Sequence, residues 1–217
     1  MTIAKEESTM RLHVFPPSPR ATKVMALANH LGLDCDVRLV DLFKGEQHKP
    51  QFAALNPNER MPVLEDDGFV LWESNAILHY LASKKPGSGL WPSDARGQAD
   101  VLRWHSWEAA HWFPACAILA FERLIKKLTG QGDPNPEEVA KGENQFHRCA
   151  GVLNAHLRGR KWLVGNDLTI ADFSVGAPMA VGEAARYPVA EYGEITRWYG
   201  ALASLPGWKK ALVPLPS

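Results

Sequence analysis

The chain has 217 residues, enough for one large domain or two small ones, and its 24 Lys and Arg balance 24 Asp and Glu. This zero net charge excludes a general electrostatic preference for nucleic acid or for an anionic membrane. A hydrophobic content of 46% excludes a chain that is disordered throughout. No run of about 18 apolar residues occurs, so we expect no membrane-spanning helix.

The cysteines and the N-terminus indicate a cytoplasmic protein. Cys35, Cys116 and Cys149 are far apart and lack the Cys/His spacing of a zinc site, so we expect no metal. Such sparse cysteines are typical of free thiols in a reducing compartment. Residues 1–9 contain acidic side chains and no apolar core of a signal peptide, and we interpret them as a flexible extension.

Residues 10–85 alternate short apolar runs with helical patterns. The expected strands are 11–15, 36–40, 62–65 and 69–71, and the expected helices are 21–31, a short one near 50–55, and 73–84. The turn Asp66-Asp67-Gly68 predicts a hairpin between the last two strands. The order βαβ–ββα predicts a small α+β domain whose sheet has parallel and antiparallel parts.

Residues 86–92 (PGSGLWP) have the composition of a linker, and the pattern changes after them. Helical spacing predicts helices at 94–129, 137–157, 169–180 and 192–203. Pro114 is expected to bend or interrupt the first of these. Residues 93–217 should therefore form an all-helical bundle.

Ser18 lies in the loop after the first strand and just before a helix. One interpretation is an N-cap serine, whose hydroxyl satisfies a backbone N–H of the helix. The other is a hydroxyl donor directed at a ligand thiolate that the helix N-terminus holds. Local sequence leaves both open.

Two further segments have a structural and a functional interpretation. Pro62 begins a strand, and the first position of a strand tolerates the missing N–H of proline. Alternatively, the Met61–Pro62 peptide bond is cis, and the backbone N–H and C=O of Met61 then face a peptide-like ligand. Glu73 and Ser74 open a helix, where they stabilise its N-terminus or bind a ligand that carries both carboxylate and ammonium.

Two segments of the helical half favour packing roles. Thr169 to Asp172 form a capping box, with Leu168 as the candidate hydrophobic staple, which predicts the start of a buried helix. His111 and Trp112 belong to an aromatic-rich helix segment, most of which should pack in the bundle.

Taken together, these motifs resemble the cytosolic glutathione transferases in order and spacing, from about residue 10 to the C-terminus. The matching segments are the serine loop, Asn56-Pro57 with Pro62, Glu73-Ser74 with Ala76-Ile77, Leu90-Trp91-Pro92 with Asp94, Trp107-Glu108, and Thr169 to Phe173. The resemblance implies a thioredoxin-like N-terminal domain, a helical C-terminal domain, a homodimer and a role in detoxification. It also implies glutathione as co-substrate and no tightly bound cofactor.

Within the family, the loop from Ser18 to Val24 resembles the phi and theta classes. By this resemblance Ser18 donates a hydrogen bond to the glutathione sulfur, and Met61 pairs through its backbone with the cysteinyl unit. Glu73 and Ser74 match the pair that holds the γ-glutamyl end.

The segment that should hold the glycyl carboxylate departs from the family pattern. Gln47 replaces a histidine common in relatives and is followed by His48 and Lys49, while Arg60 stands where many relatives carry glutamine. His48, Lys49 and Arg60 could supply positive charge to that carboxylate.

We weigh three functional hypotheses. The first is transfer of glutathione to a hydrophobic electrophile, in a cleft whose wall includes Phe15 and His111 or Trp112. The second is glutathione-dependent disulfide or peroxide reduction, for which the serine loop lacks a cysteine. The third is a non-catalytic binding module, which the presence of Ser18, Pro62, Glu73 and Ser74 disfavours.

Overall fold

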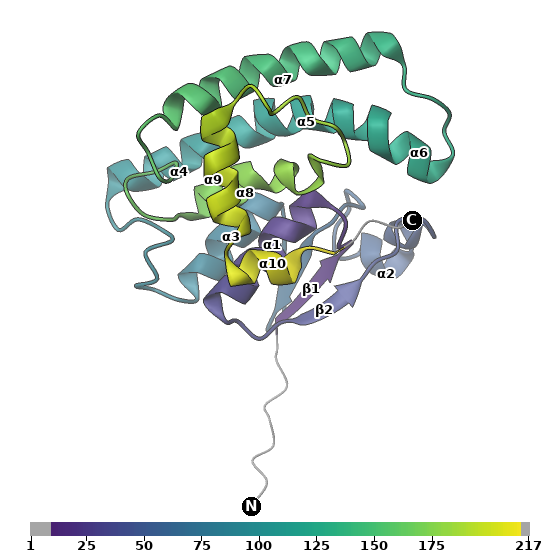
Figure 1. The fold of residues 1–217 in the computed structure, drawn as a ribbon. Helices are drawn as coiled ribbons and strands as arrows, with labels where there is room; N and C mark the ends of the chain where they lie inside the picture. Colours follow the sequence, from purple (N-terminus) through teal and green to yellow (C-terminus); the bar gives the residue numbers. More distant parts are fainter. Residues whose placement is uncertain (1–9, 214–217) are drawn as a thin grey trace, which may run out of the picture.

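The computed structural model describes residues 10–213, so the expected extension 1–9 lies outside the described part. Four strands form one mixed sheet in the order β2-β1-β3-β4, and Figure 1 shows the parallel strands β1 and β2 of this sheet side by side. The four strands are β1 (Met10–Val14), β2 (Asp36–Leu39), β3 (Val63–Asp66) and β4 (Phe69–Trp72). β1 and β2 are parallel, and β3 is antiparallel to both β1 and β4. The predicted combination of parallel and antiparallel pairs is confirmed.

Helices cover both faces of this sheet. α1 (Pro19–Leu31) and α3 (Ser74–Ser83) pack against one face, where the buried side chains of Leu12, Val14 and Leu64 meet theirs. The 3₁₀ turn η1 (Glu46–His48) precedes α2 (Pro50–Ala53), and Phe52 of α2 packs with Val63 in a small cluster of its own. The site loops thus connect elements that two separate apolar clusters hold in place.

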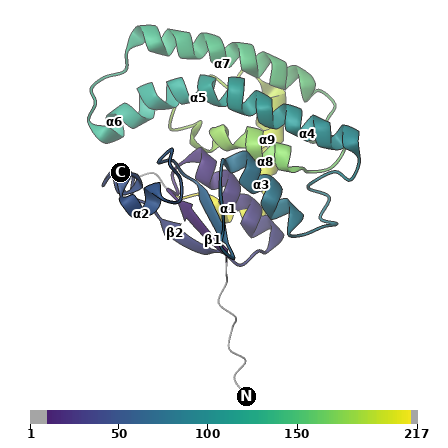
Figure 2. The same cartoon turned by 180° about the vertical axis from the view of Figure 1, so that it is seen from behind.

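The second half begins with a continuous helical stretch from residue 95 to residue 129 (Figure 2). It consists of α4 (Ala95–Trp107), the π-helical η2 (Glu108–Trp112), α5 (Phe113–Ala120), the π-helical η3 (Phe121–Ile125) and α6 (Lys126–Thr129). Pro114 lies in the first turn of α5, directly after η2. A proline cannot donate to the carbonyl one turn earlier, and the wider π turn before it accommodates this loss without ending the helix.

The remaining helices complete an all-helical bundle, as the spacing predicts. They are α7 (Pro136–His156), α8 (Ile170–Gly176) with the 3₁₀ segment η4 (Ala177–Val181), α9 (Gly193–Ala203) and α10 (Pro206–Ala211). α8 is buried along its whole length, and the capping box of Thr169 and Asp172 at its start is present. The thioredoxin-like α+β unit followed by an all-α unit is therefore confirmed.

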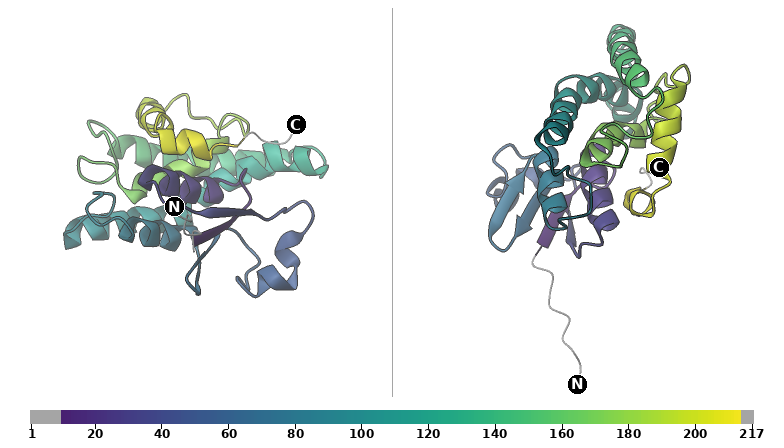
Figure 3. Two further views of the ribbon diagram at one scale, coloured as in Figure 1. Left: turned by 90° about the horizontal axis from the view of Figure 1, so that it is seen from below. Right: turned by 90° about the vertical axis from the view of Figure 1, so that its left-hand side faces the viewer.

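α10 was not predicted from the sequence, and it packs across the domains against α1. Both views of Figure 3 show the yellow α10 beside the purple α1. The two backbones approach so closely at Gly207 that a Cβ there would lie 2.6 Å from the His30 nitrogen. A glycine allows this contact because it has no side chain.

Candidate active site

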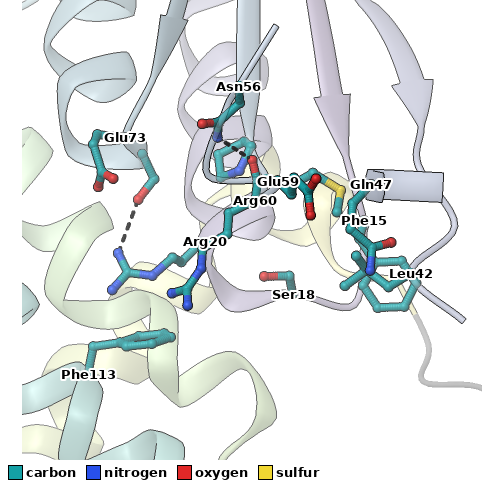
Figure 4. A pocket seen from close by; sticks show the side chains of 13 residues that line it. Phe15, Ser18, Arg20, Leu42, Gln47, Asn56, Glu59, Arg60, Glu73 and Phe113 are labelled. Atoms are coloured by element: carbon teal, nitrogen blue, oxygen red, sulfur yellow. Dashed lines mark hydrogen bonds between the residues drawn. The ribbon is translucent and has the colours of Figure 1, made fainter. Parts of the chain in front are cut away.

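The loop between β1 and α1 places Ser18 at the N-cap of α1 without using its side chain as a cap. The Ser18 backbone is extended, with φ −74° and ψ 129°, and its carbonyl accepts from the Thr22 N–H at 2.9 Å. Within residues 10–213 the Ser18 hydroxyl has no hydrogen-bond partner. In Figure 4 it points toward the side of the cleft on which the guanidinium groups of Arg20 and Arg60 lie.

A cavity of about 340 Å³ opens in front of this serine. It brings together the predicted residues Phe15, Ser18, Gln47, Arg60, Met61, Pro62, Glu73 and Ser74. They come from four loops that are separate in the sequence, and Leu42, Asn56, Glu59, Arg20 and Phe113 complete the lining. In Figure 4, Glu73 and the Arg20 guanidinium lie on one side of the cavity and Gln47 on the other, with Ser18 between them.

His48 and Lys49 do not line this cavity. The His48 Nδ1 donates to Glu59 at 2.5 Å, and its Nε2 accepts from Gln47 at 2.8 Å. Lys49 pairs with Glu46 at 2.8 Å. Both side chains are thus engaged with neighbouring glutamates, whereas the Arg60 side chain has no partner in the described part of the chain.

The Met61–Pro62 peptide bond is cis, as the family resemblance predicts. Buried Asn56 holds this loop, because its side-chain amide donates to the Arg60 carbonyl at 2.7 Å and its Oδ1 accepts from the Asn58 N–H at 3.0 Å. The backbone N–H and C=O of Met61 make no hydrogen bond to any residue from 10 to 213. They remain available to a peptide-like ligand.

Glu73 and Ser74 occupy the turn from β4 into α3. Glu73 has a φ of 71°, a conformation that costs a non-glycine residue roughly 1–3 kcal/mol and that occurs preferentially at functional sites. Ser74 is buried in the first turn of α3, and neither side chain forms a cap hydrogen bond. The free N–H groups of this turn and both side chains face the cavity.

Arg20 is a site residue that the sequence reasoning missed. Its Nη1 donates to the Ser74 hydroxyl at 3.3 Å and lies 3.9 Å from the Glu108 Oε1. Its guanidinium carbon lies 3.8 Å from the centre of the Phe113 ring, a cation–π distance. A cation in the first turn of a helix opposes the helix dipole, and this unusual position was the available signal.

A buried polar network lies behind Arg20. The Lys23 ammonium donates to Asn75 at 2.6 Å and lies 3.5 Å from Glu108, and Ser174 donates to Asn75 at 2.7 Å. Lys23 and Glu108 are both fully buried, and burial lowers the pKa of Lys23 to about 8. The network connects α1 and α3 to η2 and α8, and so joins the two halves directly beneath the site.

A second cavity, of about 370 Å³, shares Phe15, Ser18, Leu42 and Phe113 with the first. It continues along α5 and α6 and has an apolar lining. Phe15 was predicted to line the electrophile cleft, and it borders both cavities. Ser18 therefore lies where a polar cavity meets an apolar one.

Neither His111 nor Trp112 lines these two cavities. Trp112 is fully buried, and its indole N–H donates to the Val175 carbonyl at 2.9 Å, so it packs in the bundle. His111 is exposed and borders a separate cavity with Arg148. The π turn of η2 directs the next residue, Phe113, toward the cleft instead.

Residues 10–213 contain no group of three His, Cys, Asp or Glu side chains that could hold a metal. None of the helices formed by these residues has the length and apolar character needed to cross a bilayer.

Comparisons with known proteins agree on one family. The family models for the N-terminal and C-terminal domains of glutathione S-transferase match residues 8–83 and 109–206. Glutathione S-transferase 3 of Zea mays is 35% identical over 95% of this chain and 96% of its own length. The structure of glutathione S-transferase III in apo form is 32% identical, with a TM-score of 0.84 over 97% of this chain and 99% of that one.

A further solved structure carries a ligand. A glutathione transferase from Burkholderia graminis, with two glutathione molecules bound per subunit, is 26% identical, with a TM-score of 0.82 over 97% of this chain and 89% of that one. With two family models and a relative that covers almost its full length, this chain belongs to the glutathione S-transferase family.

Proposed function

We propose that this chain is a glutathione transferase in which Ser18 stabilises the glutathione thiolate for attack on a hydrophobic electrophile. The observation that carries the proposal is the unpaired Ser18 hydroxyl at the junction of a polar and an apolar cavity. The relatives named above are glutathione transferases, and one of them binds glutathione.

The polar cavity offers complementary groups along the length of the tripeptide. At one end, Glu73 faces the γ-glutamyl ammonium, while Ser74, Arg20 and the free N–H groups of α3 face its carboxylate. In the middle, the backbone of Met61 pairs with the cysteinyl unit. This assignment places the cysteinyl sulfur beside Ser18.

The opposite end of the cavity receives the glycyl carboxylate. Gln47 lies at this end, and the long Arg60 side chain, whose guanidinium lies beside that of Arg20 in Figure 4 and has no partner within the described residues, is proposed to turn toward the carboxylate when glutathione binds. A guanidinium is well suited to a carboxylate because it donates in a fixed fork geometry. His48 and Lys49 lie outside the cavity lining and pair with glutamates, so we assign them no direct contact with this carboxylate.

The chemistry requires a thiolate, and an ordinary thiol with a pKa of about 8.5 is only a few per cent ionised at neutral pH. The Ser18 hydroxyl and the N-terminus of α1 both favour the anion. The thiol proton passes to solvent, and the sulfur electron pair forms a bond to the electrophilic carbon. The displaced electron pair leaves with the leaving group or moves to the adjacent atom, which then takes a proton.

The residues that line the two cavities disfavour disulfide or peroxide reduction through a cysteine of this chain. Cys116 is the one cysteine among the described residues that line either cavity, and it is 1% exposed. Burial raises the pKa of this thiol well above its ordinary value, so it stays protonated and unreactive.

The pH–rate profile of Ser18→Ala tests the proposal. At neutral pH we expect turnover of an aromatic electrophile to fall by roughly ten- to a thousandfold, as for removal of one donor from an anion, with little change in glutathione binding. The deficit should shrink as pH rises, because more thiolate then forms without assistance. The control is Ser93→Ala, an exposed serine outside both cavities. Superimposable profiles of wild type and Ser18→Ala would assign Ser18 a structural role only.

We further propose that the protein is a cytoplasmic homodimer. Edge strand β4 supports the dimer because it exposes large apolar side chains, with Phe69 48% and Trp72 40% exposed. Cys35, Cys116 and Cys149 are all free, as expected in a reducing compartment. Sedimentation equilibrium tests the dimer, and Trp72→Glu should shift the protein to monomer.

A further inference from the structure

The apolar cavity runs away from Ser18 along one face of the helical stretch from α5 to α6. The residues that this face contributes recur at helical spacing: Phe113, Cys116, Ala117, Ala120, Leu124, Ile125 and Leu128. From the first to the last of them, a rise of 1.5 Å per residue gives a length of about 22 Å. The cavity is therefore a groove several helical turns long, and we call it the α5–α6 groove.

The other walls of the α5–α6 groove are apolar as well. The N-terminal half supplies Phe15, Pro17, Pro19, Leu42 and Phe43, and the segment after α8 supplies Pro178 and Val181. Phe15 and Phe43 stack edge to face with ring centres 5.5 Å apart. No Asp, Glu, Lys, Arg or His is among the described residues that line the groove.

The hydroxyl groups farther along the groove are already used. Tyr187 donates to the Cys116 carbonyl at 3.0 Å, and Thr129 donates to the Ile125 carbonyl at 2.8 Å. Among the lining residues that the structure describes, Ser18 alone keeps an unpaired hydroxyl, at the end where the two cavities meet. A polar substituent along the groove would lose its water without gaining a partner, which is unfavourable.

We propose that the electrophile is an elongated acyclic molecule with its reactive carbon at one end and an apolar, unbranched tail, and that Ala117 and Ala120 leave room for this tail. The inference rests on the proposed glutathione transfer, which fixes the reacting sulfur beside Ser18. A compact ring would fill the end of the groove near Phe113 and leave the apolar surface of Leu124 and Leu128 in water. A tail that follows the helix face covers this surface, and each buried methylene adds to binding.

Unbranched alkyl isothiocyanates are suitable probes. The thiolate attacks the central carbon and forms the new C–S bond, while the electron pair of the C=N bond moves to nitrogen, which takes a proton from water. No group leaves and no oxidant is needed, so the head group stays constant along the series and only the tail varies.

The test measures kcat/KM for the series from ethyl to dodecyl at saturating glutathione. Full burial of one methylene favours binding by about fourfold, so we expect a rise of about two- to fourfold per carbon that ends at the length of the groove. A carboxylate at the end of the hexyl chain should lower kcat/KM at least tenfold, because the lining offers no charge to pair with it.

Ala120→Phe places a ring in the middle of the groove. It should lower kcat/KM for decyl isothiocyanate at least tenfold more than for ethyl isothiocyanate. The matched control is Ala140→Phe, the same change at an exposed position of α7 outside the groove, and it should preserve the chain-length profile. If Ala120→Phe does not fold, Ala117→Leu, a smaller obstruction that lies nearer to Phe113 along α5, decides the question in the same assay.

Conjugation that is independent of tail length, or that Ala120→Phe lowers equally for all tails, would overturn the assignment of elongated substrates and leave the proposed glutathione transfer intact. Absence of glutathione-dependent conjugation with every isothiocyanate and with an aromatic electrophile would overturn both.

Discussion

Replacing Asp172 by alanine removes the acceptor of four hydrogen bonds inside the helical half. Its Oδ1 accepts from the Leu163 N–H and from the Trp198 indole, each at 2.9 Å, and its Oδ2 accepts from the Thr169 N–H at 2.9 Å and the Thr169 hydroxyl at 3.3 Å. Asp172, Leu163 and Trp198 are all fully buried. The side chain thus ties the start of α8 to α9 and to the segment before it.

The magnitude follows from the donors left behind. A buried donor without a partner costs roughly 1–3 kcal/mol, and Asp172→Ala leaves two backbone N–H groups and one indole N–H in this state. A water molecule that enters the vacated space accepts from some of these three donors. The expected loss in the free energy of unfolding is therefore about 3–5 kcal/mol at pH 5. This exceeds the ~0.5–2 kcal/mol of an ordinary capping residue, which the sequence alone would have predicted.

Urea unfolding followed by far-UV circular dichroism, at one protein concentration, measures this loss. The control is Asp94→Ala, since Asp94 also caps a helix by accepting from two backbone N–H groups, those of Arg96 and Gly97, but is exposed. We expect Asp94→Ala to cost less than half as much. Equal losses for the two variants would refute the argument that burial of the unpaired donors sets the cost.

Further predictions concern the pH dependence and the site. Burial raises the pKa of Asp172 from 3.8 to about 6. The folded state therefore holds this proton more tightly than the unfolded state, so the contribution to stability is full below pH 4 and is lost as pH rises through 6. The difference in the free energy of unfolding between wild type and Asp172→Ala, measured in urea, should narrow from pH 4 to pH 7. Lys23→Met removes the nearer of the two cations beside the buried Glu108 carboxylate and leaves only Arg20 at 3.9 Å, so it should cost about 3 kcal/mol in the same assay, whereas adding Glu108→Met should restore most of the loss. Glu73→Ala should raise the glutathione KM more than it lowers kcat in steady-state kinetics, because it removes binding remote from the sulfur. Arg20→Lys should raise the same KM nearly as much as Arg20→Ala, because an ammonium cannot reproduce a guanidinium stacked on a ring.

The buried network beneath the site also holds Arg20 in its position in the cleft. Glu108 Oε1 has no hydrogen-bond partner among residues 10–213 and lies 3.9 Å from Arg20, which in turn contacts Ser74. The position of Arg20 in the cleft therefore depends on groups from both halves of the chain. We therefore expect the γ-glutamyl end of the proposed site to depend on the helical half, although the predicted binding residues all belong to the first half.

Apart from α10, the sequence by itself determined the main elements and their order. Strand-like runs, the hairpin turn, the helical spacing and the capping box of Thr169 and Asp172 are local patterns, and the structure places each of them within a few residues of the prediction. The order and spacing of these motifs also predicted the family and the cis bond before Pro62. Such features depend on neighbours in the chain, so the sequence contains their cause.

Tertiary structure alone decided which side chains face the cleft. Trp112 points into the bundle and Phe113 toward Ser18, because the π turn of η2 rotates the helix face ahead of Pro114. Arg20 becomes a site residue through contacts with residues more than fifty positions away. α10 is six residues long, too short to form from its own propensity, and it exists because it packs on α1. These outcomes depend on long-range packing, which no local pattern encodes.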